Sequence, residues 1–118
     1  MVATPTPAHA ATGGGCSSVT VVSNVGTDKA CISTPGSGKA VATGYLNLYA
    51  GHPYCQYQVN IWNGSNMRVA TTGKRPCPKT SAATPVTYIT NMGALRASIE
   101  VFYSGTSRQT YSPVIVMP

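Results

Sequence analysis

The fold is decided by residues 44–62, which read Gly-Tyr-Leu-Asn-Leu-Tyr-Ala-Gly-His-Pro-Tyr-Cys-Gln-Tyr-Gln-Val-Asn-Ile-Trp. In the second half of this stretch Cys55, Tyr57, Val59 and Ile61 fall on one side, and Gln56, Gln58, Asn60 and Trp62 on the other. Such period-two alternation is typical of a half-buried β-strand. Residues 45–49 alternate in a similar way, and the breaker Ala-Gly-His-Pro at 50–53 separates the two runs. We therefore predict a β-hairpin over residues 44–62.

The remaining sequence predicts further strands. A second alternating run covers residues 95–103, and an apolar stripe with helical spacing is nowhere sustained beyond one turn. Asn63-Gly64 predicts a type I′ turn, and Pro113 marks the last strand as an edge or divides it in two. About eight short strands with frequent turns indicate an all-β fold, a small antiparallel β-sandwich or barrel.

Four cysteines in a short chain rich in Gly and Thr indicate two disulfides and an oxidising compartment. None of them forms the close C-x2-C pair of a zinc site. Of the three possible connectivities we favour Cys16–Cys31 and Cys55–Cys77, because each pair brackets one expected hairpin. The length suits one domain, which we expect over 16–118, and we expect residues 1–15 to be a disordered tail left from a leader.

The N-terminal residues carry a signal of export. Ala8-His9-Ala10 before Ala11 has the A-x-A form of a signal-peptidase site. The apolar segment of a signal peptide is missing upstream, so we expect Met1 to be an added start and the natural mature chain to begin near Ala11. No run approaches the roughly 18 apolar residues of a membrane span. These features predict a secreted protein without a transmembrane segment.

Composition argues against catalysis. Charged residues make up 8% of the chain, and eight basic residues against two acidic ones give a net charge of +6. A cationic surface favours anionic partners, but these basic residues form no tract.

The only carboxylic side chains are Asp28 and Glu100, and we expect Glu100 to pair with Arg96 on a strand. His52 falls in an expected turn, and no catalytic motif is present. We predict no enzyme, no metal, no cofactor and no nucleic-acid partner.

Residues 72–79, Thr-Gly-Lys-Arg-Pro-Cys-Pro-Lys, are a candidate binding loop. Prolines on both sides of Cys77 restrict its backbone, and a preorganised loop loses little entropy on binding. Under this hypothesis the protein inhibits a secreted hydrolase, and the binding residues are Lys74, Arg75, Pro76 and Lys79. Lys74 would enter a trypsin-like specificity pocket, whereas Arg75 is less suited because Pro76 follows it.

A second candidate surface is aromatic. Tyr45, Tyr49, Trp62 and Phe102 occupy positions that alternate away from the expected core. Asn and Gln side chains at neighbouring positions would supply hydrogen bonds, and aromatic rings beside amides suit sugar rings. Under this hypothesis Tyr45, Tyr49 and Trp62 bind a glycan.

Three segments of the chain have a familiar arrangement. They are Gly44–Tyr49, a Tyr-Leu strand; Tyr54–Ile61, a cysteine-led strand; and Gln109–Val114, with a late Tyr-x-Pro-Val. Together with the Ala-His-Ala-Ala leader remnant, they resemble the small secreted actinobacterial proteins of the spore-associated protein A type. The resemblance implies a protein of aerial hyphae and spores that has no catalytic residues. The short spacing of Cys16 and Cys31 is also similar to that in small streptomycete amylase inhibitors, although their Trp-Arg-Tyr recognition motif is absent.

The leading prediction is a secreted, non-catalytic β-domain of the cell envelope or spore surface of an actinobacterium. Its expected partner is an extracellular protein or a cell-wall polymer. The alternative is a proteinaceous inhibitor of a secreted protease or amylase, acting through residues 74–79. We expect a monomer.

Overall fold

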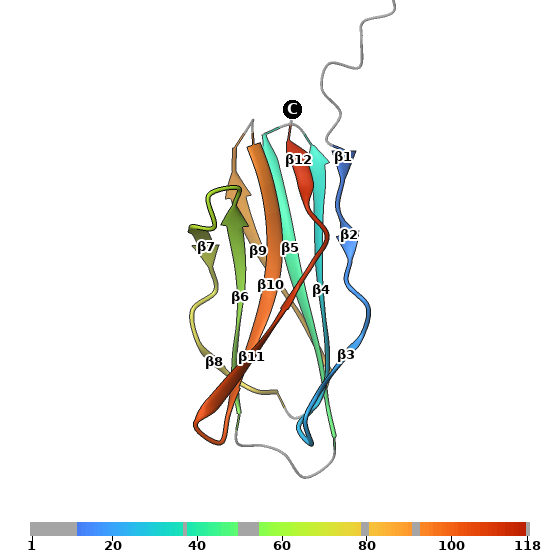
Figure 1. Ribbon diagram of the computed structural model, residues 1–118, viewed down its shortest axis with the longest axis vertical. Helices are drawn as coiled ribbons and strands as arrows, with labels where there is room; N and C mark the ends of the chain where they lie inside the picture. The colour runs from blue at the N-terminus through green and yellow to red at the C-terminus, as the bar shows by residue number, and fades with distance from the viewer. Residues whose placement is uncertain (1–11, 37, 50–54, 79–80, 91–92, 118) are drawn as a thin grey trace, which may run out of the picture.

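The computed structural model describes residues 12–36, 38–49, 55–78, 81–90 and 93–117. These residues form twelve β-strands in two antiparallel sheets that pack face to face (Figure 1). The all-β sandwich expected from the alternating sequence is confirmed, and the two sheets remain open rather than closing into a barrel. Nowhere in the described ranges does the chain form a helix with the length and hydropathy needed to cross a bilayer.

The strands are β1 (Thr12–Gly13), β2 (Gly15–Cys16), β3 (Thr20–Val22), β4 (Gly26–Gly36), β5 (Lys39–Leu48), β6 (Gln56–Asn63), β7 (Arg68–Thr71), β8 (Arg75–Pro76), β9 (Ala82–Ile89), β10 (Gly93–Tyr103), β11 (Thr106–Tyr111) and β12 (Ile115–Met117). The seven-stranded sheet has the order β1-β12-β10-β6-β7, and in it β11 also pairs with β10 and β8 with β6. The five-stranded sheet has the order β2-β4-β5-β9, with β3 on β4. The chain changes sheets between β1 and β2, β5 and β6, β8 and β9, and β9 and β10.

The hairpin predicted over residues 44–62 is wrong in its pairing. Both runs form strands, but β5 pairs with β4 and β9, whereas β6 pairs with β7, β8 and β10. The chain therefore leaves the five-stranded sheet after β5 and enters the other sheet at β6. Alternation predicts which side chains are buried, while the partner of a strand depends on the whole chain.

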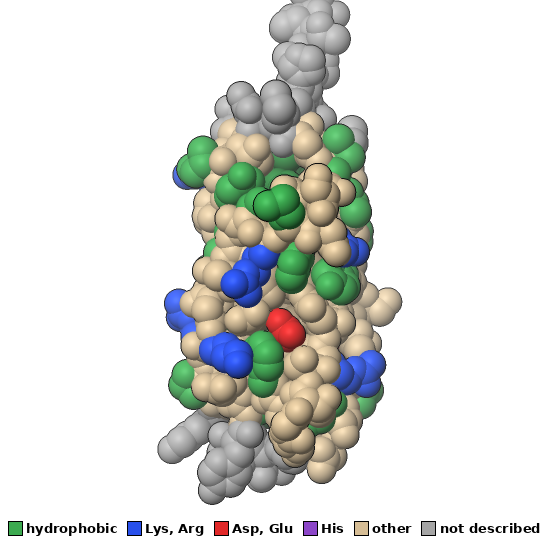
Figure 2. Space-filling view, turned by 60° about the vertical axis from the view of Figure 1, so that its left-hand side comes forward, with side chains coloured by type: hydrophobic (Ala, Val, Ile, Leu, Met, Phe, Trp, Pro, Cys, Tyr) green, Lys and Arg blue, Asp and Glu red, His purple; other side chains and the backbone are tan. Residues whose placement is uncertain are grey.

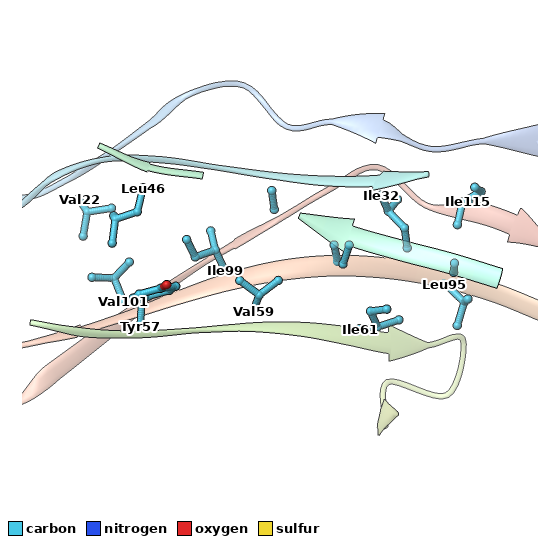
Figure 3. Close-up of a cluster of buried hydrophobic side chains, with 14 of the residues drawn as sticks. Val22, Ile32, Leu46, Tyr57, Val59, Ile61, Leu95, Ile99, Val101 and Ile115 are labelled. Atoms are coloured by element: carbon cyan, nitrogen blue, oxygen red, sulfur yellow. The ribbon is translucent and has the colours of Figure 1, made fainter. Parts of the chain in front are cut away.

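The core lies between the sheets and uses the inward faces predicted for both alternating runs (Figure 3). The buried side chains of these runs are Tyr57, Val59 and Ile61 on β6 and Leu95, Ala97, Ile99 and Val101 on β10. They form one cluster with Ile32 and Leu46 of the five-stranded sheet. Gly44 of β5 faces the other sheet at close range, because a Cβ there would lie 2.5 Å from Val59 Cγ2. The Tyr57 hydroxyl and Thr84 Oγ1 form a buried 2.7 Å hydrogen bond between the sheets.

Both predicted disulfides are confirmed, Cys16–Cys31 and Cys55–Cys77. The first joins directly opposed residues of β2 and β4. The second ties the start of β6 to the end of β8, where the Cys77 amide also donates to the Cys55 carbonyl at 2.9 Å. Strand pairing begins at Thr12, before the domain boundary expected at Cys16, because β1 pairs with β12. The rest of the predicted tail, residues 1–11, lies outside the described residues.

The chain reverses between β6 and β7 as expected, but the type I′ turn predicted at Asn63-Gly64 is wrong. The positive φ falls on Asn66, at 60°. Asn63 Oδ1 accepts hydrogen bonds from the amides of Ser65 and Met67, and this local bonding favours a longer loop. The predicted break at Pro113 is confirmed, since β11 ends before it and β12 begins after it.

The edge strand β9 carries a proline at its centre. Pro85 lies opposite Thr43 of β5. Because proline has no N–H group, it removes one hydrogen-bond donor from the open edge of the five-stranded sheet. This arrangement opposes edge-to-edge pairing with another chain.

Candidate binding face

The outer face of the seven-stranded sheet gathers aromatic, amide and charged side chains, and it is termed the aromatic face below. The register of the three strands places on it Gln56, Gln58, Asn60 and Trp62 of β6, Arg96, Ser98, Glu100 and Phe102 of β10, and Gln109 and Tyr111 of β11. Lys74 and Arg68 border it from the neighbouring edge. Figure 2 is turned toward the side of β6, β7 and β8, and it shows basic, apolar and acidic side chains close together.

The floor of the aromatic face is a buried hydrogen-bond network centred on Ser98. Ser98 Oγ accepts from Trp62 Nε1 at 2.8 Å and from Asn60 Nδ2 at 3.3 Å. The same hydroxyl donates to Gln109 Oε1 at 2.7 Å. Ser98 and Asn60 are fully buried. Asn60 Oδ1 is buried without a hydrogen-bond partner, but all three bonds of the Ser98 hydroxyl are made, and they fix the orientation of the half-buried indole.

At one end of the face, Trp62, Tyr111 and Arg96 form an aromatic cluster. The rings of Trp62 and Tyr111 are tilted by 58° with centroids 6.4 Å apart. The Arg96 guanidinium lies 4.0 Å from the centroid of the Tyr111 ring. Its Nη2 also donates to Asn66 Oδ1 at 2.9 Å. Arg96 is therefore held in place by a ring and by an amide, neither of which neutralises its charge.

At the other end of the face, Lys74 and Phe102 border a hollow. Lys74 Nζ lies 4.3 Å from the centroid of the Phe102 ring. The hollow has a volume of about 660 Å³ and is lined also by Cys55, Gln56 and residues 103–107 of the β10–β11 turn. Ser104 and Gly105 both have positive φ, of 48° and 74°, as a two-residue type I′ turn requires. Hydroxyl, amide and ammonium groups thus lie beside the Phe102 ring in a space large enough for a small ligand.

Glu100 lies between these two ends, and it does not pair with Arg96 as predicted. It accepts a 3.0 Å hydrogen bond from Gln58 Nε2 on the neighbouring strand. Arg96 and Glu100 are four residues apart on an extended strand, a separation of about 13 Å along the chain. The expectation of an ion pair was wrong because alternation puts two residues on one face without bringing them into contact.

The predicted inhibitor segment lies against the sheet. Arg75 and Pro76 form β8, opposite Tyr57 and Gln56 of β6. Lys74 is directed toward Phe102. Lys79 lies outside the described residues. Within the described part of the segment, Arg75 and Pro76 pair with the sheet as a two-residue strand, and the position of Lys74 makes it part of the aromatic face.

The three aromatic residues predicted to act together lie on opposite sides of the sandwich. Tyr45 and Tyr49 belong to the β5 end of the five-stranded sheet and are 40% and 46% exposed. Tyr45 is opposite Lys29, whose Nζ lies 4.7 Å from the centroid of its ring. Trp62 faces outward from the other sheet. The structure therefore brings Trp62 together with Phe102 on one face and separates both from Tyr45 and Tyr49.

Tyr111 and Arg96 are members of the aromatic face that the sequence-based hypothesis missed. A usable signal was present, because Ser104-Gly105 is a two-residue turn signal after an alternating strand. A two-residue turn at this position pairs Tyr103 with Thr106. Following the antiparallel register away from the turn along both strands then places Tyr111 opposite Ser98.

The second carboxyl group of the chain is inside the sandwich. Asp28 is 2% exposed, and its Oδ1 accepts a 2.7 Å hydrogen bond from Thr110 Oγ1. Its Oδ2 is buried without a hydrogen-bond partner. Burial raises the pKa of Asp28, and the Thr110 hydrogen bond and the nearby charge of Arg108 oppose that rise. Asp28 lies between the sheets on β4, whereas Glu100 lies on the outer face of the seven-stranded sheet, so the two carboxyl groups cannot act as a pair.

Metal coordination finds no support in the described ranges, where no three His, Cys, Asp or Glu residues form a group that could hold an ion. No family model, no curated protein and no solved structure matches the chain. The aromatic face must therefore be interpreted from its own residues, which suit binding through stacking and hydrogen bonds.

Proposed function

We propose that this protein is an extracellular, non-catalytic binding domain that attaches through its aromatic face to a polysaccharide of the cell envelope. The observation that carries the proposal is the arrangement of Trp62, Tyr111 and Phe102 around a floor of hydrogen-bonded amides. Sugar rings have apolar faces that stack on aromatic rings and hydroxyl groups that bond to amides. The aromatic face supplies both kinds of contact.

Preorganisation of the face supports binding rather than a purely structural role. The indole of Trp62 is fixed through Ser98, and the guanidinium of Arg96 through Tyr111 and Asn66. Groups that are already ordered lose little entropy when a ligand arrives. A ligand that contacts this face therefore keeps most of the free energy of its stacking and hydrogen bonds.

The length of the face favours a polymer over a small molecule. Arg96 and Phe102 are six residues apart on β10, which corresponds to about 20 Å along the strand. The hollow beside Phe102 continues this surface at one end. An extended chain of sugars could contact both ends at once, and linked contacts raise the overall affinity.

An extracellular location fits the two disulfides, which persist in oxidising compartments. The A-x-A motif at residues 8–10 points the same way. The placement at the wall or spore surface of an actinobacterium rests on the resemblance of the three segments to spore-associated proteins, and it is part of this proposal.

Sedimentation with washed actinobacterial cell walls tests the proposal. The oxidised protein should pellet with the walls, and Tyr111→Ala, which removes an exposed ring of the aromatic face, should leave more protein in the supernatant. Tyr45→Ala is the matched control, since it removes a similarly exposed tyrosine from the opposite sheet and should pellet like the wild type. Complete recovery of the wild type in the supernatant, or equal loss with both variants, would contradict the assignment.

A further inference from the structure

We infer that the ligand of the aromatic face is an acidic polysaccharide, whose carboxylate or phosphate groups bind to Lys74 and Arg96 while its sugar rings contact the adjacent aromatic side chains. This inference rests on the proposed function and adds the chemical class of the polymer. It begins from the charges on the face.

The aromatic face has more cations than anions, and its cations are not neutralised. Arg68, Lys74 and Arg96 lie on or beside it, against Glu100 alone. Glu100 is engaged by Gln58. Within the described chain, neither Lys74 nor Arg96 forms an ion pair with a carboxylate. Both cations are free to bind an anion from outside.

Both cations are positioned against aromatic rings. Lys74 Nζ is 4.3 Å from the ring centroid of Phe102, and Arg96 Cζ is 4.0 Å from that of Tyr111. The face of an aromatic ring attracts a cation through its quadrupole and restricts the motion of a long side chain. Each end of the aromatic face therefore has a positive charge next to an aromatic ring. An acidic group binds there most favourably when the sugar that carries it also packs on that ring.

The surroundings of Lys74 favour a sugar as the unit that carries the acid. The hollow beside it is lined by the amide of Gln56 and by hydroxyl groups of the β10–β11 turn, at Ser104, Thr106 and Ser107. Amides and hydroxyls both donate and accept, as the hydroxyl groups of a sugar require. A purely ionic ligand would leave these groups unused, and an apolar ligand would leave them without partners.

The two cation–aromatic pairs are far enough apart to contact different units of one polymer. Ser98 is opposite Tyr111 and Phe102 is opposite Ser107, so the two rings lie at positions four residues apart on β10, about 13 Å along the strand. A polymer with acidic groups at regular intervals can reach both cations. Binding through two charged contacts should depend strongly on salt.

Affinity electrophoresis and biolayer interferometry with defined polymers test this inference. The probes are a phosphomannan, the neutral mannan that matches it, polygalacturonate, and a single-stranded oligonucleotide. The wild type should bind phosphomannan or polygalacturonate at least tenfold more tightly than mannan, and this preference should shrink when salt is raised. Comparing the affinities for the two acidic polymers shows whether the aromatic face prefers phosphate or carboxylate groups.

Charge-removing variants separate the two ends of the face. Lys74→Gln and Arg96→Gln should each weaken binding to the acidic polymer by about tenfold, the loss expected when one charge-assisted hydrogen bond is removed. Lys39→Gln is the matched control, because it removes an exposed lysine from the five-stranded sheet and should bind like the wild type. Circular dichroism of each variant confirms that the sandwich is folded.

The outcomes distinguish this inference from the proposed function. Equal binding of mannan and phosphomannan would overturn the acidic class while leaving polysaccharide binding intact, as would unchanged affinity in both glutamine variants. Binding to none of the polysaccharides would overturn the proposed function itself. Tighter binding of the oligonucleotide than of either acidic polymer would assign the face to nucleic acid instead.

Discussion

Replacing Thr110 by valine should destabilise the protein in a pH-dependent way. The Thr110 hydroxyl makes the one hydrogen bond that the structure shows to the buried carboxyl group of Asp28. Valine has nearly the same shape, so the substitution removes the bond without opening a cavity. Hydrogen bonds to charged groups contribute about 1.5–3 kcal/mol to stability, and we expect a loss of that size at neutral pH.

The sign of the pH dependence follows from the pKa of Asp28, which burial raises above the ordinary value of 3.8. The folded state therefore binds the proton more readily than the unfolded state does. Stability is lower above the folded-state pKa of Asp28 and rises as the pH falls through that value toward 3.8. Once Asp28 is protonated, the Thr110 hydroxyl bonds to a neutral group, and the cost of Thr110→Val should fall to about 0.5–1.5 kcal/mol.

Urea unfolding at pH 7 and near pH 3, followed by the fluorescence of the single tryptophan, measures both costs. With a urea dependence of about 1–3 kcal/mol per molar for a small domain, the midpoint at pH 7 should fall by about 1 M. Asp28→Asn is the control, because in that background Thr110→Val should cost the same at both pH values. An equal loss at both pH values in the wild-type background would refute the reasoning, since it would mean that the charge of Asp28 plays no part.

Three further experiments test the packing. Gly44→Ala should destabilise the domain by about 1–3 kcal/mol, because its new methyl group would overlap a core side chain of the facing sheet; a neutral result in thermal unfolding would show that the sheets can separate. Tyr57→Phe should cost about 1 kcal/mol, because Thr84 loses its partner between the sheets, and Thr84→Val should restore part of that loss in the double variant. Removing the Cys55–Cys77 bridge with two alanines should cost about 3 kcal/mol, as expected for closing a loop of this length, and should weaken polymer binding by releasing the strand next to Lys74; unchanged binding by the folded variant would show that β8 holds without it.

The core could be predicted from the sequence because the alternation of apolar and polar residues along a strand indicates which of its faces is buried. Tyr57, Val59 and Ile61 were expected inside, and so were Leu95 and Ile99; all of them are buried. The disulfide pairing was also accessible, since each bridge closes a short stretch of chain. These features depend on residues that are near one another in sequence.

The strand partners could not be predicted in the same way. The run ending at Tyr49 and the run beginning at Cys55 look like two arms of a hairpin, yet each forms a hairpin with a different neighbour, β4 or β7, and its other main partner, β9 or β10, comes from far away in the chain. Pairing of β5 with β4 and β9 satisfies the same alternation equally well, so the local pattern does not decide between the two topologies.

The uncertainty in strand pairing also affected the prediction of which aromatic residues share a face. Trp62 was identified as outward-facing, and it was grouped with Tyr45 because both residues alternate away from the expected core. Once the arms belong to different sheets, the same outward direction places them on opposite surfaces. Residues such as Tyr111 enter the site only through the register of β10 with β11, which the turn at Ser104-Gly105 fixes.

The pairing of β1 with β12 decides how the protein would be displayed on a surface. Thr12 and Val116 are directly opposed, so both ends of the described chain leave the sandwich at the same end (Figure 1). The β10–β11 turn, which lines the hollow beside Phe102, lies at the far end of the molecule. An attachment at the Thr12 end or at the Met117 end of the sandwich would therefore leave the hollow at the opposite end of the domain. Immobilising the protein through its N-terminus and through its C-terminus should consequently give equal access to a soluble polymer.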